Sequence, residues 1–170
     1  NRETTLHMRV KSFYGHDEKK ILADFLATIS KIESINSKWC FAGHNIKEFD
    51  IPFICRRLII NQFKIPAYLD FQNMKPWETN IVDTFQYWRF GDYKNYTSLK
   101  LLAAAMGVPS PKDDIDGSMV GELYWLASDR EANLKRIAVY CQKDVITTGN
   151  IILRFRNMPP VPPEDIRIVE

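Results

Sequence analysis

Residues 39–54 read WCFAGHNIKEFDIPFI, and this stretch predicts a strand, a turn and a helix in that order. The apolar run 39–43 follows polar residues and is too short for a helix, so it is typical of a buried strand. Over residues 50–61 the apolar spacing becomes helical, and Pro52 suits the first turn of a helix. We therefore expect Asp50 at or near a helix N-terminus, shortly after the strand.

The rest of the chain alternates between the sequence periods of strands and helices. Residues 5–13 alternate apolar and polar side chains and predict a half-exposed edge strand, and residues 80–85 predict another short strand. Helices are predicted over residues 18–32, 97–107, 119–127 and 129–156. Strands that alternate with helices indicate an α/β domain with a sheet that is at least partly parallel.

The last predicted helix carries a second group of polar residues, Tyr140-Cys141-Gln142-Lys143-Asp144. Tyr140 and Asp144 are four residues apart, so their side chains lie on one face of the helix. Both flank a predicted buried stripe that runs through Cys141. This pattern places them at the edge of an expected cleft.

Asp50, Tyr140 and Asp144 suit metal-assisted hydrolysis of a phosphodiester bond. Mg²⁺ and Mn²⁺ prefer carboxylate and water oxygens, and two ions about 3.5–4 Å apart stabilise the attacking and leaving oxygens. A phenol beside the ions can orient the attacking water. Structural roles are the alternatives: Asp50 as a helix cap, Asn45 as a turn residue, and the tyrosine and aspartate of the helix as surface residues. Their joint occurrence in fitting local structures favours catalysis.

The composition indicates what class of protein this is, but it does not indicate which partner the protein binds. The chain has 170 residues, 45% of them hydrophobic, and a formal net charge of +2, which suits one compact domain without a strong basic field. Cys40, Cys55 and Cys141 are widely spaced in apolar stretches, so we expect them to be reduced and buried. No apolar run approaches the ~20 residues of a membrane span. We expect a cytoplasmic protein that does not contact a membrane.

These two groups of residues, together with Ser98-Leu99, Gly107-Val108-Pro109 and Asp116-Gly117-Ser118, resemble the DEDD superfamily of 3′-5′ exonucleases. The similarity is to its tyrosine-bearing branch, specifically to the predicted exonucleases related to the proofreading domain of family B DNA polymerases, and covers about residues 18–156. It implies an RNase H-like (ribonuclease H-like) fold with a mixed sheet flanked by helices. It also implies a reaction that releases nucleoside monophosphates from a 3′ end.

The resemblance further implies a role for each residue. Asp50 and Asp144 would be ligands of two Mg²⁺ or Mn²⁺ ions and would be catalytic together with Tyr140, which would position the nucleophile. Asn45 and Phe49 would bind the substrate. The expected partner is the 3′ end of a single-stranded nucleic acid, with DNA favoured over RNA.

The family's first motif, Asp-x-Glu on the opening strand, is not found before the first predicted helix. The Asp-x-Glu of this chain, Asp129-Arg130-Glu131, stands between the other two motifs and begins a helix. Two of four expected carboxylates and the opening central strand are therefore missing, and we expect the 170 residues to be inactive. We interpret the chain as a trimmed piece of a longer polypeptide. A strand supplied by another segment or chain, and a non-catalytic relative, are the alternatives.

We predict an exonuclease domain over residues 1–157 and a proline-rich tail or linker over residues 158–170. Residues 85–96 interleave aromatic and basic side chains, as a stacking platform for single-stranded nucleic acid would, and packing is the alternative. The rival to the exonuclease hypothesis is a nucleic-acid-binding or protein-interaction module that keeps the fold without the chemistry.

Overall fold

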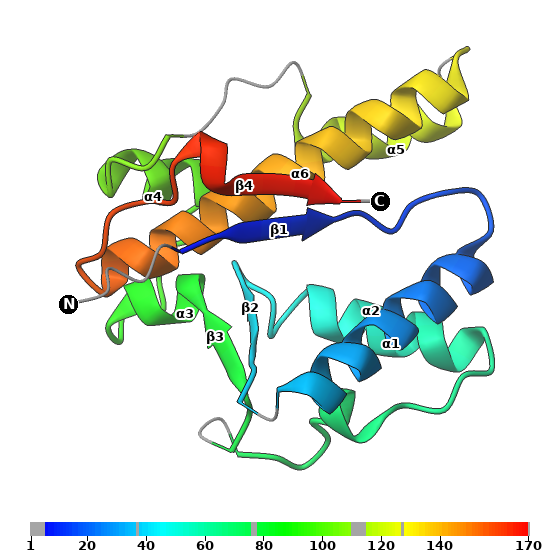
Figure 1. Cartoon of the computed structure of the whole chain (residues 1–170), viewed down its shortest axis with the longest axis horizontal. Helices are drawn as coiled ribbons and strands as arrows, with labels where there is room; N and C mark the ends of the chain where they lie inside the picture. The colour runs from blue at the N-terminus through cyan, green and yellow to red at the C-terminus, as the bar shows by residue number, and fades with distance from the viewer. Residues whose placement is uncertain (1–5, 37, 76–77, 110–114, 127, 170) are drawn as a thin grey trace. The chain divides into compact units, whose positions relative to one another are not determined.

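The computed structural model describes residues 6–36, 38–75, 78–109, 115–126 and 128–169. It divides into two compact units (Figure 1). The β2–β3 unit is His16–Tyr96, and the α6 unit combines Asn1–Gly15 with Thr97–Glu170. Each unit has a hydrophobic core of its own, so each is described separately. The alternation of strands and helices predicted from the sequence is confirmed, and the chain is an α/β protein.

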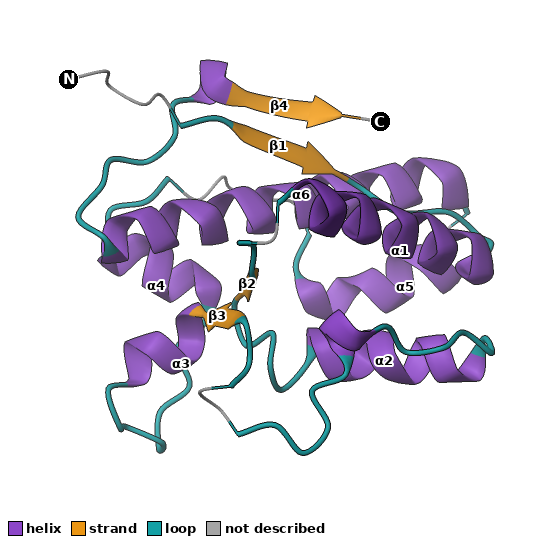
Figure 2. Ribbon diagram, turned by 60° about the horizontal axis from the view of Figure 1, so that its bottom comes forward, coloured by secondary structure: helices purple, strands orange, loops and turns teal. Residues whose placement is uncertain are grey.

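The β2–β3 unit begins with helix α1, Glu18–Ile35, at the position that the sequence predicted. The carboxylate of Asp17 accepts a hydrogen bond from the Lys20 N–H at 3.0 Å and so caps the helix. Strand β2 (Phe41–Gly43), helix α2 (Asp50–Ile60), strand β3 (Ile81–Asp83) and helix α3 (Thr84–Arg89) follow along the chain. Figure 2 shows the two short strands between the helices of this unit.

Strands β2 and β3 pair in parallel, with Phe41 opposite Ile81 and Gly43 opposite Asp83. Their carboxyl ends therefore lie at the same edge of the two-stranded sheet. Gly43 is required there, because a Cβ atom at this position would lie 2.6 Å from the Cβ of Ile46 in the following turn.

The core of the β2–β3 unit joins α1 to α2 and to the segment after α2. Leu22 of α1 packs with Ile51 and Leu58 of α2 and with Leu69, and all four side chains are buried. The helical spacing of these apolar residues places them on the inner faces of the two helices. Burial of Ile51 fixes the rotation of α2 directly beside Asp50.

The α6 unit is built on one long helix, α6, which runs from Arg130 to Phe155 and is capped by Asp129. Helix α4 (Leu99–Ala105) contributes Leu102 and Ala103 to a core that also contains Val108 and Ile151. A short 3₁₀ helix (Gly117–Met119) and helix α5 (Val120–Trp125) precede α6. Strands β1 (Met8–Lys11) and β4 (Ile166–Val169) complete the unit.

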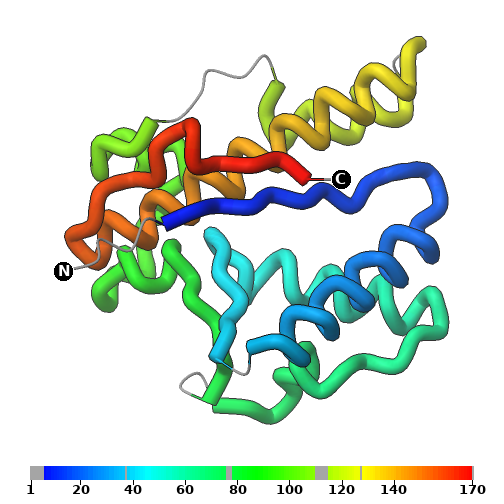
Figure 3. The backbone as a smooth tube through the Cα atoms, in the orientation of Figure 1, coloured from blue at the N-terminus to red at the C-terminus, as the bar shows by residue number. Residues whose placement is uncertain are grey.

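Strand β4 pairs in parallel with β1, with Met8 opposite Ile166 and Lys11 opposite Val169. The first and last parts of the chain thus run side by side (Figure 3). Residues 158–162 lie outside any helix or strand, and Pro163 begins a 3₁₀ helix (Pro163–Asp165) that leads into β4. The segment predicted as a proline-rich tail or linker therefore contains a strand. The buried Val161 anchors this segment, because its N–H donates to the buried Asn150 Oδ1 at 2.9 Å.

The prediction of three buried cysteines is wrong for two of them. All three are free thiols, but Cys40 and Cys141 are exposed and Cys55 is half-buried. On α6 the buried side chains gather near the two ends of the helix, as Leu134 and Ala138 at one end and Thr147, Thr148 and Ile151 at the other. The middle of the predicted stripe, including Cys141 and Val145, is exposed. No helix in the described ranges is both long and apolar enough to cross a membrane.

We expect removal of residues 158–170 to leave strand β1 without its hydrogen-bonded neighbour β4. The main-chain groups of Met8–Lys11 would lose their partners in β4, and Asn150 would lose the N–H of Val161. Hydrogen–deuterium exchange should therefore accelerate at Met8–Lys11 and remain unchanged in α1. The variant Arg167→Ser, which alters an exposed side chain of β4, is the control and should keep β1 protected. Protected β1 amides in the shortened chain would contradict the prediction.

Candidate active-site residues

The turn between β2 and α2 is held by a buried carboxylate at the end of the neighbouring strand. Asp83 Oδ1 accepts hydrogen bonds from the backbone N–H of Asn45 at 3.0 Å, and Oδ2 accepts from the N–H of Lys47 at 3.1 Å. Oδ1 also accepts from Phe85 at 3.0 Å and Gln86 at 3.4 Å, so the same side chain caps α3. Asp83 is only 5% exposed, and its hydrogen bonds keep the carboxylate from being left unpaired in the interior.

Three further contacts join this turn and the end of β2 to α3. The His44 Nδ1 lies 3.0 Å from the Thr84 hydroxyl oxygen, and that hydroxyl donates to the carbonyl oxygen of Gly43 at 3.2 Å. The Arg89 guanidinium lies 3.6 Å from a carboxylate oxygen of Glu48. The turn that carries the predicted substrate-binding residues is therefore fixed from several directions.

Asn45 lies in this turn in a left-handed backbone conformation, with φ of 60°. Asparagine tolerates this conformation better than most residues, so the structural role considered for Asn45 is confirmed. The side chain of Asn45 also has a feature that a role in the turn does not explain. The Asn45 Oδ1 is buried and has no hydrogen-bond partner among the described residues. Such an acceptor is costly unless an ordered water or a ligand supplies a donor.

Phe49 and Asp50 follow at the start of α2. The Phe49 ring is 65% exposed and lies parallel to the Phe53 ring, with centroids 6.3 Å apart and an interplanar angle of 11°. Asp50 is the first residue of α2, as the sequence predicted. Although the residue is exposed, the surrounding protein removes enough solvent from its carboxyl group to raise the pKa, and the negative charge of Asp83 raises it further.

In the α6 unit, Tyr140 and Asp144 lie one turn apart on α6, as their spacing predicted. Burial raises the pKa of Tyr140 to about 12, and the charge of Asp144 and its hydrogen bond to the phenol add to the rise. The phenol is therefore protonated throughout the neutral range and can donate its hydrogen to Asp144. Asp144 itself is half-buried.

The loop before α5 contributes a third polar group close to Tyr140. The charge of Asp116 adds to the rise in the pKa of Tyr140, and a Cβ atom at Gly117 would lie 3.8 Å from the Tyr140 hydroxyl oxygen. Asp116 accepts hydrogen bonds from the N–H and the hydroxyl group of Ser118, which lower its own pKa. No role in the site was predicted for Asp116, although its Asp-Gly-Ser motif is part of the sequence that resembles the nuclease family.

The structure brings the predicted residues together within two groups. Asn45, Phe49 and Asp50 belong to the β2–β3 unit, and Tyr140 and Asp144 belong to the α6 unit. In the part of the chain that the structure describes, no group of three or more histidine, cysteine, aspartate or glutamate side chains could hold a metal ion. The carboxylate of Asp129, in the chain's Asp-x-Glu sequence, caps α6. If it bound a metal ion instead, the helix would lose this cap. The two carboxylates predicted as metal ligands thus belong to different units, Asp50 to the β2–β3 unit and Asp144 to the α6 unit.

We expect Asp83→Ala to lower the free energy of unfolding by about 3 kcal/mol, because several N–H groups in and beside the turn would lose a charged acceptor. Asp83→Asn keeps one acceptor oxygen and should cost less. Asp92→Ala is the control, since Asp92 makes hydrogen bonds of the same kind in an exposed turn and its loss should matter less. Urea unfolding followed by circular dichroism measures all three. Equal losses for Asp83→Ala and Asp92→Ala would refute the role of the buried carboxylate.

We expect Asp144→Asn to lower the pKa of Tyr140 from about 12 but to leave it above 10.0, because burial is the largest cause of the rise. An NMR pH titration of ¹³Cζ-labelled tyrosine measures this pKa, and the Tyr140→Phe spectrum identifies the signal. Glu122→Gln, which removes an exposed charge from α5, is the control and should not move the pKa. An unchanged pKa in Asp144→Asn would show that the carboxylate and the phenol do not interact.

Comparison with known proteins bears on the reaction class. No curated protein and no solved structure gives a significant match to the chain. A protein-family model described as predicted 3′-5′ exonuclease related to the exonuclease domain of PolB matches residues 2–160, which is most of the chain. The match includes every residue that the sequence analysis assigned to the site. The chain thus belongs to the family of predicted 3′-5′ exonucleases related to the exonuclease domain of PolB.

Proposed function

We propose that this chain is a 3′-5′ exonuclease domain with an RNase H-like fold, which acts on the 3′ ends of single-stranded nucleic acid, with DNA favoured over RNA. Family membership supports the reaction class. The buried Asn45 Oδ1, which lacks a partner among the described residues, is the observation that supports binding of a chain end. The cytoplasmic location stays a prediction.

An amide oxygen accepts hydrogen bonds, so the group that satisfies Asn45 must be a donor. The hydroxyl at the 3′ end of a strand is such a donor, whereas the same oxygen inside a DNA strand is esterified and has no hydrogen to donate. The hydrogen bond between the Asn45 N–H and Asp83 fixes the backbone that carries this acceptor. A ligand that displaced the groups covering this oxygen would meet an acceptor whose backbone is already held in place.

Phe49 is proposed to contact the base of the terminal nucleotide. Its exposed ring is supported from one side by the ring of Phe53, so one aromatic face is held in a defined orientation. Stacking of a base on an aromatic side chain contributes about 1–3 kcal/mol and is tolerant of sequence. This tolerance suits an enzyme that removes successive nucleotides of any kind.

Tyr140 is proposed to orient the attacking water. Its raised pKa keeps the phenol neutral, so it can both donate and accept hydrogen bonds at neutral pH. The hydrogen bond to Asp144 directs the phenol toward the carboxylate that is proposed as a metal ligand. Tyr140→Phe would keep the ring and remove only this function.

Asp50 and Asp144 are the proposed ligands of Mg²⁺ or Mn²⁺, as the family resemblance implies. Two divalent ions need more anionic oxygens than these two residues provide. We therefore expect very slow hydrolysis by the 170 residues themselves, so binding of a 3′ end is the more sensitive test.

The test compares single-stranded oligonucleotides that end in a 3′-hydroxyl or in a 3′-deoxy sugar, by fluorescence anisotropy. We expect the hydroxyl to strengthen binding by about tenfold, the effect of one hydrogen bond to a buried acceptor. Asn45→Gly keeps the left-handed backbone accessible but removes the acceptor, so it should abolish the difference. Asn45→Asp keeps an acceptor and should preserve it. Equal binding of both oligonucleotides to the unaltered protein would overturn the proposal.

A nucleic-acid-binding module without chemistry is the second candidate, and exposed aromatic side chains near α3 favour it. Phe90 and Tyr93 are 83% and 78% exposed, and the Arg89 guanidinium lies 5.4 Å from the centre of the Tyr93 ring. Phe85, in contrast, is buried and packs beneath Arg89, so it cannot stack on a base. If Phe90→Asn with Tyr93→Ala weakened binding of both oligonucleotides equally, and Asn45→Gly had no effect, this candidate would be preferred.

A further inference from the structure

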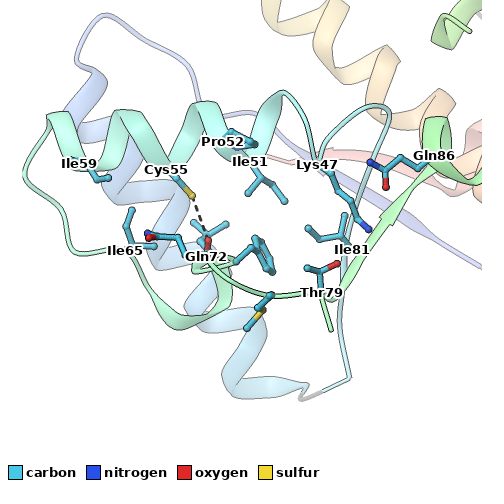
Figure 4. Close-up of a pocket in the computed structure, with 13 residues that line it drawn as sticks. Lys47, Ile51, Pro52, Cys55, Ile59, Ile65, Gln72, Thr79, Ile81 and Gln86 are labelled. Carbon is cyan, nitrogen blue, oxygen red and sulfur yellow. Dashed lines mark hydrogen bonds between the residues drawn. The ribbon is translucent and has the colours of Figure 1, made fainter. Parts of the chain in front are cut away.

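The β2–β3 unit contains a pocket that the proposed nuclease function does not use. Helix α2 forms one wall with Ile51, Cys55 and Ile59, and the opposite wall comes from the segment after α2 and from the start of β3 (Figure 4). Its volume is about 410 Å³, which lies within the range of about 300–1,000 Å³ that is typical of small-molecule sites. The whole lining belongs to one unit, so the pocket is a property of that unit alone.

The lining is mostly apolar, with a few polar side chains at defined places. The apolar side chains of the lining include Ile51, Ile59, Ile65, Leu69, Phe71 and Ile81. The polar groups are those of Lys47, Gln72, Thr79 and Gln86. A predominantly apolar cavity with a few polar groups is the usual composition of a site that binds an organic molecule and fixes its orientation.

The two ends of the pocket differ in charge. Lys47, Thr79 and Gln86 lie together at one end, whereas Ile59, Cys55 and Ile65 lie at the other (Figure 4). Cys55 donates a hydrogen bond to the Leu69 carbonyl oxygen at 3.5 Å. Burial raises the pKa of the Cys55 thiol, and the negative charge of Asp70 raises it further. A ligand's negative charge would be repelled from the Cys55 end and attracted to the Lys47 end.

Lys47 is well placed to supply the positive charge. Its backbone N–H donates a hydrogen bond to Asp83, so the backbone position from which its side chain extends is fixed. Within the described ranges its ammonium group makes no ion pair, whereas the neighbouring Glu48 pairs with Arg89. The ammonium group thus lines the pocket without a carboxylate at ion-pair distance among the residues that the structure describes.

We propose that this pocket binds an amphiphilic small molecule, an elongated apolar body with one anionic group, with the anion at Lys47 and the apolar end toward Cys55 and Ile65. The apolar body would replace solvent along the isoleucines of α2. The anionic group would accept hydrogen bonds from the ammonium group of Lys47 and from the amide of Gln86. This inference does not depend on the nuclease activity, and the two can fail separately.

Alkylation of Cys55 by N-ethylmaleimide provides a local measurement, because this thiol lines the pocket. Burial raises the pKa of the thiol, so the reaction is best followed at mildly alkaline pH, where more thiolate is present. Mass spectrometry of peptides gives the rate at Cys55 and, as an internal control, at the exposed Cys40 of the same unit. The probes are dodecanoate, dodecanol and dodecyltrimethylammonium, which share the apolar chain and differ in charge.

We expect dodecanoate to slow alkylation at Cys55 and not at Cys40, at concentrations below those at which dodecanol or the ammonium compound has an effect. Lys47→Gln should weaken the protection by dodecanoate by about tenfold, as expected for loss of one charge-assisted hydrogen bond. Lys31→Gln, which removes an exposed charge from α1, is the matched control and should leave it unchanged.

Two results would overturn the proposal. Absence of protection by every probe would show that the pocket does not bind such molecules. Equal protection by dodecanoate and dodecanol, unaffected by Lys47→Gln, would show an apolar cavity without preference for an anion. Neither result would bear on the recognition of 3′ ends, which depends on Asn45.

Discussion

The hydrogen bonds accepted by Asp83 are the constraint on which the β2–β3 unit depends. One buried carboxylate at the end of β3 binds the backbone of the turn after β2 and caps α3 at the same time. This turn determines where α2 begins. The position of α2 then determines the exposure of Asp50, and the helix forms one wall of the apolar pocket. Features that differ in chemistry therefore share one structural origin.

The same carboxylate also affects the electrostatics of its surroundings. Its charge contributes to the raised pKa of Asp50, so a cation near Asp50 would be stabilised by two carboxylates, although only one of them is accessible. In the α6 unit the situation is comparable, because Asp144 and Asp116 both influence Tyr140. Each unit thus places negative charge beside a polar group of the proposed site, so a cation at Asp50 or beside Tyr140 would be favoured, and it would screen these charges as an anionic strand approaches.

Features set by neighbouring residues were predictable from the sequence. Capping and helical spacing predict three of them: the cap of α1 at Asp17, the position of Asp50 at the start of α2, and the proximity of Tyr140 to Asp144. The Asp83 contacts were not predictable, because they join residues 36 and 38 positions apart. For the same reason the pairing of β4 with β1, the approach of Asp116 to Tyr140 and the pocket were missed. A periodic pattern shows which face of an element is apolar but not which distant element covers it.

The pairing of β1 with β4 has a consequence for the order in which the chain can fold during synthesis. The β2–β3 unit is one continuous segment, so it can form its core as soon as Tyr96 has left the ribosome. Strand β1 precedes β4 by more than 150 residues, so the pairing of these two strands must wait until β4 has been made. Until then the edge of β1 that β4 covers lacks this partner, which exposes it to association with other nascent strands. The exposed Arg9 and Lys11 on this strand would oppose such association by charge repulsion between copies.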